Sequence, residues 1–169
     1  TVKLERVAGE QLRPARHEGV KLPIPVLAQQ TRGLGVINLS ADADGPTRRV
    51  PLLGQVDGHL VPHLSLAVAQ YVLGAREVTV GRDRMQVGSR TVPLDADGHL
   101  LIDWHGSLEQ TYHARKYSIG RVLQAFAQQE QGERAELDAS LFKDKVVLVA
   151  GTAAGLYDLR VTPFSSATP

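Results

Sequence analysis

The tetrapeptide Asp-Ala-Asp-Gly occurs twice, at residues 42–45 and 95–98, and no other feature of the sequence constrains the fold as much. Asp-Gly tolerates the positive φ angles of tight turns and is a strong signal for a β-hairpin. The first copy lies between two predicted strands, residues 36–39 and 47–53. The second copy precedes the alternating apolar residues of segment 100–104. Both copies are therefore predicted to be hairpin turns that fix the register of two β-ribbons.

Two helices are predicted from apolar spacing and terminal residues. The first spans residues 62–73, where Pro62 suits the first helical position and Gly74 suits the stop. This helix is apolar nearly all round, which predicts that it is well buried. The second spans residues 118–131, with Ser118 as N-cap and a Gln-rich face opposite its apolar face.

A continuous apolar run at residues 146–150 is typical of a strand buried on both faces, usually a central parallel strand. Alternation at 77–80 and the Gly88-Ser89 dipeptide predict a further strand and a hairpin. The expected fold class is therefore α/β, a mixed sheet with β-hairpins, a buried central strand near 146–150 and helices near 62–73 and 118–131.

The chain length of 169 residues fits a single domain, residues 1–169. Residues 1–33 are expected to be an irregular N-terminal segment, because Pro23 and Pro25 impose an extended stretch. Within it, Val2, Leu4 and Val7 could form a short strand. Regular structure is expected to begin at Gly35.

Composition excludes several classes of protein. The formal net charge of +1, without a basic cluster, argues against a nucleic-acid partner. The chain has no cysteine, which excludes disulfides, thiolate zinc sites and cysteine nucleophiles, and which suits an oxidising compartment. No apolar run approaches the roughly 20 residues of a membrane-spanning helix.

The acidic turns invite a test for calcium. An EF-hand loop needs an oxygen ligand at position 5 and a glutamate at position 12. Counting from Asp42 or from Asp95, those positions hold unsuitable residues, so neither turn is an EF-hand. A calcium site of another type stays open if the two turns converge in space. His59 and His63 have a helical spacing, but Pro62 must start the helix between them, so two surface or rim histidines are expected rather than a metal site. We expect no bound metal and no cofactor.

The glycine-rich loop at 151–155 follows the apolar run, where ligands often bind in α/β sheets. It matches neither a Walker A loop nor a dinucleotide fingerprint, and the chain has no nucleophile elbow. The loop could contribute to a small polar site or could be a tight connection. Asp44 could pair with Arg48 and Arg49 as an exposed ion pair or could face an anionic or zwitterionic ligand. The candidate ligand-binding residues are Asp44, Arg48, Arg49, Asp97, Thr152, Asp158 and Arg160.

An ordered series of landmarks resembles a known family. The series comprises Gly-Val-Ile-Asn at 35–38, Asp-x-Asp-Gly at 42–45, Arg-Arg-Val-Pro-Leu at 48–52, Pro-His-Leu-Ser-Leu-Ala at 62–67, Val-Pro-Leu-Asp-x-Asp-Gly at 92–98, Leu-Ile-Asp-Trp-His-Gly at 101–106, Phe-Lys-Asp-Lys and the apolar run with Gly-Thr-Ala at 142–153, and Thr-Pro-Phe at 162–164. Over residues 35–164 the chain is similar to the second type of CHASE domain, the cyclase/histidine-kinase-associated sensory extracellular domains. The resemblance implies the C-terminal portion of such a domain, hence a fragment of a larger sensory domain.

The resemblance also implies a function. Such a domain is a non-catalytic sensor on the extracytoplasmic face of a bacterial inner-membrane receptor, whose transmembrane helices and cytoplasmic cyclase or kinase belong to the parent protein. Its partner would be an unknown small-molecule or protein signal, and a homodimer is possible. Two alternatives stay open: a structural or dimerisation module without a small-molecule ligand, and a hydrolase that uses the 151–158 loop.

Overall fold

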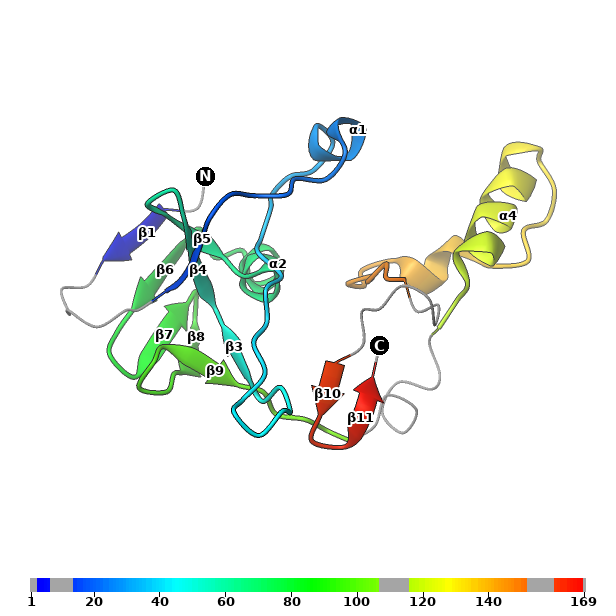
Figure 1. Cartoon of the computed structure of the whole chain (residues 1–169). Helices are drawn as coiled ribbons and strands as arrows, with labels where there is room; N and C mark the ends of the chain where they lie inside the picture. Colours follow the sequence, from blue (N-terminus) through cyan, green and yellow to red (C-terminus); the bar gives the residue numbers. More distant parts are fainter. Residues whose placement is uncertain (1–2, 7–13, 107–115, 152–159, 169) are drawn as a thin grey trace. The chain divides into compact units, whose positions relative to one another are not determined.

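The computed structural model describes residues 3–6, 14–106, 116–151 and 160–168 (Figure 1). The chain divides into two compact units, and each is described by itself. Unit 1 comprises Thr1–Trp104 and Val161–Pro163, and unit 2 comprises His105–Arg160 and Phe164–Pro169. Helices and mixed sheets occur together, so the α/β class is confirmed. The single domain expected from the chain length stays a prediction.

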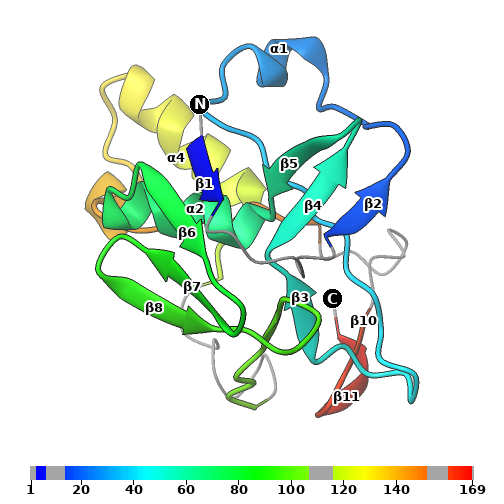
Figure 2. The same cartoon turned by 90° about the vertical axis from the view of Figure 1, so that its left-hand side faces the viewer.

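A four-stranded sheet forms the best-buried part of unit 1 (Figure 2). Its order is β1-β6-β7-β8, with β1 parallel to β6 and the other neighbours antiparallel. The strand bounds are β1 Lys3–Arg6, β6 Glu77–Val80, β7 Arg84–Val87 and β8 Arg90–Pro93. The side chains of Val78, Met85 and Val87 are almost completely buried. The predicted hairpin is confirmed, and Gly88 takes the positive φ of +57° in its turn.

A second sheet in unit 1 has the order β2-β4-β5. Its strands are β2 Ala15–His17, β4 Leu53–Val56 and β5 His59–Pro62. The β4–β5 hairpin turns at Asp57 and Gly58, which both have positive φ, as a tight two-residue loop requires. A separate antiparallel pair joins β3, Arg49–Pro51, to β9, His99–Leu101.

The N-terminal prediction is wrong in part. Residues 1–33 were expected to be irregular, yet β2 and the short helix α1, Pro25–Ala28, lie there. β1 coincides with the short strand that the apolar residues Val2, Leu4 and Val7 allowed. The strand expected at 36–39 is reduced to a single bridge between Val36 and His63. The strand after the first Asp-Ala-Asp-Gly turn pairs with β9 instead, which leaves 36–39 without a strand partner.

Helix α2 spans Leu64–Leu73 rather than 62–73 (Figure 2). Pro62 is the last residue of β5, and His63 is the N-cap. Gly74 ends the helix in the left-handed conformation, as predicted. The expectation that the helix is well buried is wrong: the strands of unit 1 cover one face, whereas Tyr71 on the other face is 71% exposed.

Unit 2 contains helix α4, Ile119–Glu130. The Ser118 hydroxyl oxygen accepts a hydrogen bond from the Arg121 amide, so the predicted N-cap is confirmed. The chain returns along the helix, where Arg121 pairs with Glu136 at 2.7 Å. The short 3-10 helix η1, Ala139–Phe142, follows, and the ring of Phe142 packs edge-on against Tyr117.

The predicted buried central strand near 146–150 is wrong for this structure. Residues 145–150 are not in a strand, and Val146, Val147, Leu148 and Val149 are 53–82% exposed. A strand buried on both faces needs a partner strand on each side, and no described strand pairs with this run.

Two short strands close the described chain, β10 at Arg160–Thr162 and β11 at Ser165–Thr168. They form a two-stranded sheet. In unit 1, the Thr47 amide donates to the carbonyl of Val161 at 2.8 Å, and Thr162 is buried. Residues 161–163 therefore lie beside the first Asp-Ala-Asp-Gly turn within unit 1.

Candidate functional site

The two Asp-Ala-Asp-Gly turns have the same backbone geometry. In each, the glycine amide donates to the carbonyl of the first aspartate: Gly45 to Asp42 at 2.9 Å, and Gly98 to Asp95 at 3.0 Å. In each, the amide of the first aspartate donates to the carbonyl four residues later. Both glycines have positive φ, +105° and +82°, which explains why glycine stands at this position.

The turns do not join paired strands, so the hairpin prediction is wrong in its pairing. β3 follows the first turn and β9 follows the second, and these two strands pair with each other. Each turn therefore leads into one strand of the same ribbon. This arrangement brings the two acidic turns together, which spacing along the chain does not reveal.

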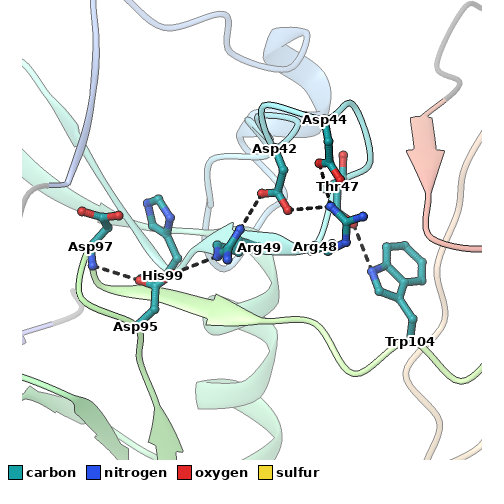
Figure 3. Close-up of polar contacts among 9 residues, drawn as sticks. All are labelled: Asp42, Asp44, Thr47, Arg48, Arg49, Asp95, Asp97, His99 and Trp104. Atoms are coloured by element: carbon teal, nitrogen blue, oxygen red, sulfur yellow. Dashed lines mark hydrogen bonds and ion pairs between the residues drawn. The ribbon is translucent and has the colours of Figure 1, made fainter.

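Arg49 connects the two turns through its guanidinium group (Figure 3). Its Nη1 lies 2.9 Å from Oδ1 of Asp42, and its Nε lies 3.2 Å from Oδ2 of Asp95. The Asp42 side chain is only 15% exposed and that of Asp95 is 30% exposed. Arg49 thus holds together two carboxylates that would otherwise repel each other across the ribbon.

Arg48 adds the more exposed Asp44 to this group of ion pairs. Its Nη1 lies 3.1 Å from Oδ2 of Asp42 and 2.8 Å from Oδ1 of Asp44, so the expected pairing of Asp44 with Arg48 is present. The hydrogen bond from Arg48 lowers the pKa of Asp44, and the same contacts raise the pKa of Arg48. Because the Asp44 side chain is 63% exposed, solvent screens this outer link more than the inner ones.

Asp95, the first aspartate of the second turn, makes contacts through both of its carboxylate oxygens. Oδ1 of Asp95 accepts hydrogen bonds from the amides of Asp97 at 3.0 Å and His99 at 2.9 Å, while Oδ2 faces Arg49. Asp97 takes part through its backbone amide (Figure 3). The first aspartate of this turn, rather than Asp97, is therefore the residue that reaches the cluster.

Trp104, which follows β9, contacts the backbone next to the two arginines. Its indole Nε1 donates to the carbonyl of Thr47 at 3.0 Å (Figure 3). The amide of Ile102 donates to the carbonyl of Arg48 at 2.8 Å. These two hydrogen bonds fix the backbone of Thr47 and Arg48, directly before Arg49.

We call Asp42, Asp44, Arg48, Arg49 and Asp95 the turn cluster. The acidic turns do converge, as an unconventional calcium site would require, but their carboxylates face guanidinium groups. Among the described residues, no three His, Cys, Asp or Glu side chains come together in a way that could hold a metal ion. The arrangement can stabilise the ribbon, and its outer Arg48–Asp44 pair can exchange partners with a charged ligand.

The structure brings together three of the seven predicted site residues, Asp44, Arg48 and Arg49. Asp97 adjoins them through Asp95. Thr152 and Asp158 lie outside the described residues, and of Arg160 only the backbone of β10 is described.

Sequence reasoning missed Asp42 and Asp95, the first aspartate of each turn. The signal was available, because an aspartate that opens a turn commonly accepts a hydrogen bond from the backbone two residues later.

His59 and His63 do not form a pair. His59 is exposed at the start of β5, whereas His63 is only 9% exposed at the N-cap of α2. The expectation of two surface or rim histidines is therefore wrong for His63. The cause is that β5 continues to Pro62, so the helix starts two residues later than predicted and His63 is covered by residues 35–36.

Comparison with known proteins gives the family. A model of the CHASE2 domain family matches residues 3–169, which includes the N-terminal segment that the sequence landmarks left out. Neither the curated proteins nor the solved structures contain a match. Among the described helices, none is long and apolar enough to cross a membrane. From the ordered landmarks and the match over nearly its whole length, the chain belongs to the CHASE2 family of extracellular sensory domains.

Proposed function

We propose that this chain is the extracytoplasmic sensory domain of a bacterial transmembrane signalling receptor and has no catalytic activity of its own. The family match over residues 3–169 carries this proposal. A chain without cysteine also suits an oxidising compartment, because no thiol can form a wrong disulfide there. In such a receptor, other parts of the protein would supply the inner-membrane helices and a cytoplasmic cyclase or kinase as output.

The signal would be a small molecule or a protein that engages the turn cluster from outside. The outer pair, Arg48 and Asp44, is the part that solvent reaches most easily, with Asp44 63% exposed. A zwitterionic ligand offers a carboxylate to Arg48 and an ammonium group to Asp44, and so replaces both partners without leaving a charge unpaired. Arg49 and Asp97 would border this site. Thr152, Asp158 and Arg160 stay candidate ligand-binding residues from the sequence alone.

Signalling would follow from a population shift. A ligand favours one of two arrangements only to the extent that it binds that arrangement more tightly. Moving the receptor from about 1% to about 99% of one state requires roughly 10⁴-fold tighter binding to that state. Exchange of the Arg48–Asp44 pair would provide part of this difference, because the pair lies next to the link that joins the two turns.

The location can be tested with a reporter in the full-length gene product. A phosphatase that needs disulfides for activity folds only outside the cytoplasm. Inserted at the exposed β7–β8 turn, it is expected to be active in intact cells. An inactive phosphatase, together with a fluorescent cytoplasmic reporter at the same position, would contradict the proposal.

A structural or dimerisation module is the second candidate, and the exposed apolar helix faces favour it. On α4, Ile119, Leu123 and Phe126 lie on one face and are each about 60% exposed. Exposed apolar faces of this kind commonly mark interaction surfaces. Sedimentation of the chain over a range of concentrations tests this candidate: it predicts a dimer that the Leu123→Asp variant dissociates, and a monomer at every concentration would exclude it.

A further inference from the structure

His63 occupies an unusual position at the start of α2. Its ring Nδ1 accepts a hydrogen bond from the Ser65 amide at 3.3 Å and lies 2.9 Å from the Ser65 hydroxyl. Because an amide N–H can only donate, Nδ1 must present a free electron pair. The ring is therefore neutral, with its proton on Nε2, and it acts as the N-cap of a ten-residue helix.

The neighbouring backbone fixes the His63 ring in this place. The His63 amide donates to the carbonyl of Leu52 at 2.8 Å, and Val36 forms a parallel bridge with His63. Gly35 lies so close that an added Cβ would come within 2.6 Å of the Leu64 Cα. Residues 35–36 thus lie directly on the backbone of the first turn of α2, next to the residue that carries the ring.

Strands β2, β4 and β5 and helix α2, which adjoin His63, carry no carboxylate that could stabilise a positive charge on the ring, and the Ser65 hydroxyl 2.9 Å from Nδ1 is a neutral group. The Nε2 atom of His63 is buried and has no hydrogen-bond partner. The adjoining segment 33–37 and strand β4 carry no ionisable side chain. The ionisable side chains of the neighbouring strands are Arg16 and His17 in β2 and His59 in β5, and none is acidic. Arg16 and His59 are exposed, and His17 has an equally unpartnered Nε2.

We propose that His63 is an acid-sensitive latch on α2, in which a proton from solvent binds Nδ1, displaces the hydrogen bond from the Ser65 amide and releases residues 35–36 from the first turn of the helix. The protonated ring would also place a positive charge at the positive end of the helix dipole. The lost hydrogen bond and the repulsion from the helix dipole both destabilise the first turn of α2 when the ring is charged.

The direction of the pH dependence follows from burial. Burial lowers the pKa of His63 from its ordinary value of 6.5. The folded chain therefore binds this proton more weakly than the unfolded chain does. The contribution of the neutral ring to stability is complete above about pH 6.5, and it is lost as the pH falls through the pKa of the folded state.

An extracytoplasmic domain experiences the pH of its surroundings, so the latch would give the receptor a response to external acid. This consequence rests on the proposed function, whereas the latch itself does not. A measurement on the isolated 169-residue chain therefore tests the latch independently of where the protein resides.

The test is an NMR titration of the histidine rings and backbone amides, combined with urea unfolding between pH 7.5 and pH 4.5, from about one pH unit above to about two pH units below the ordinary histidine pKa. We expect His63 to titrate below 6.5 and the Ser65 amide to shift with the same midpoint. The ratio of folded to unfolded chain should fall with decreasing pH by up to about tenfold per pH unit for this one proton.

The variants His63→Asn and His59→Asn form a matched pair. Asparagine is a good N-cap without a titrating group, so His63→Asn should lose the acid-dependent part of the unfolding curve, while His59→Asn keeps it. Equal pH dependence in His63→Asn and the unmodified chain would overturn the proposal. If His63→Asn does not fold, the titration of the unmodified chain decides: a His63 midpoint at or above 6.5, or an unmoved Ser65 amide, would overturn it.

Discussion

Replacing Arg49 by methionine is expected to lower the free energy of unfolding by about 1–2 kcal/mol. Methionine keeps the apolar length of the side chain and removes the charge, so the loss reports on the two contacts with Asp42 and Asp95 rather than on a cavity.

The magnitude follows from the exposure of the three side chains. A hydrogen bond to a charged group contributes about 1.5–3 kcal/mol, whereas an exposed ion pair contributes about 0.2–1 kcal/mol. Arg49 is 45% exposed and its two partners are 15% and 30% exposed, so each contact lies between these limits. Removing the cation also leaves Asp42 and Asp95 facing each other, which adds to the loss.

Urea unfolding followed by circular dichroism measures this loss, and Arg84→Met is the matched control. Within the part of the chain that the structure describes, Arg84 pairs with the adjacent Asp83 alone, and both side chains are about 65% exposed, so its replacement should cause no measurable change. A double-mutant cycle of Arg49→Met with Asp95→Asn should give a coupling energy of about 0.5–1 kcal/mol. A loss no larger than that of Arg84→Met, or a coupling of zero, would refute the role of Arg49 as the link between the turns.

Two further predictions concern packing. Met85 has no exposed surface, so Met85→Ala should lower the free energy of unfolding in urea by about 2–5 kcal/mol. Leu148 is 82% exposed, so Leu148→Ala should change the free energy of unfolding hardly at all. Similar losses in the two variants would contradict the position of the core. Gly35→Ala should destabilise the chain, because the new Cβ would overlap the Leu64 backbone, whereas Gly33→Ala meets no atom within 4 Å and should be tolerated. Thermal unfolding of both glycine variants checks this, and equal melting temperatures would contradict the close approach.

Local signals in the sequence predicted local structure well. The two acidic turns, the hairpin at Gly88 and the Ser118 cap are present because each depends on residues a few positions apart. The Asp57-Gly58 turn has the same kind of local signal, although it was not among the predicted turns.

Features that depend on distant partners were not predictable. The pairing of β3 with β9 is set by which strands meet in space, so the hairpin partners were assigned wrongly although both turns were correct. The apolar composition of α2 predicted burial on all sides, but burial depends on what packs against each face. The run 146–149 has the composition of a central strand, yet a strand forms only where neighbouring strands complete it.

The most direct test of the sensory assignment is the location of the folded domain in living cells. The chain contains no cysteine, so Ser89→Cys in the exposed β7–β8 turn gives it a single reactive thiol. In the full-length gene product, we predict that a membrane-impermeant maleimide labels this thiol in intact cells, while Val87→Cys, at a position 1% exposed on the same hairpin, stays unlabelled until the protein is denatured. Labelling of Ser89→Cys only after the cells are broken would contradict an extracytoplasmic sensory domain.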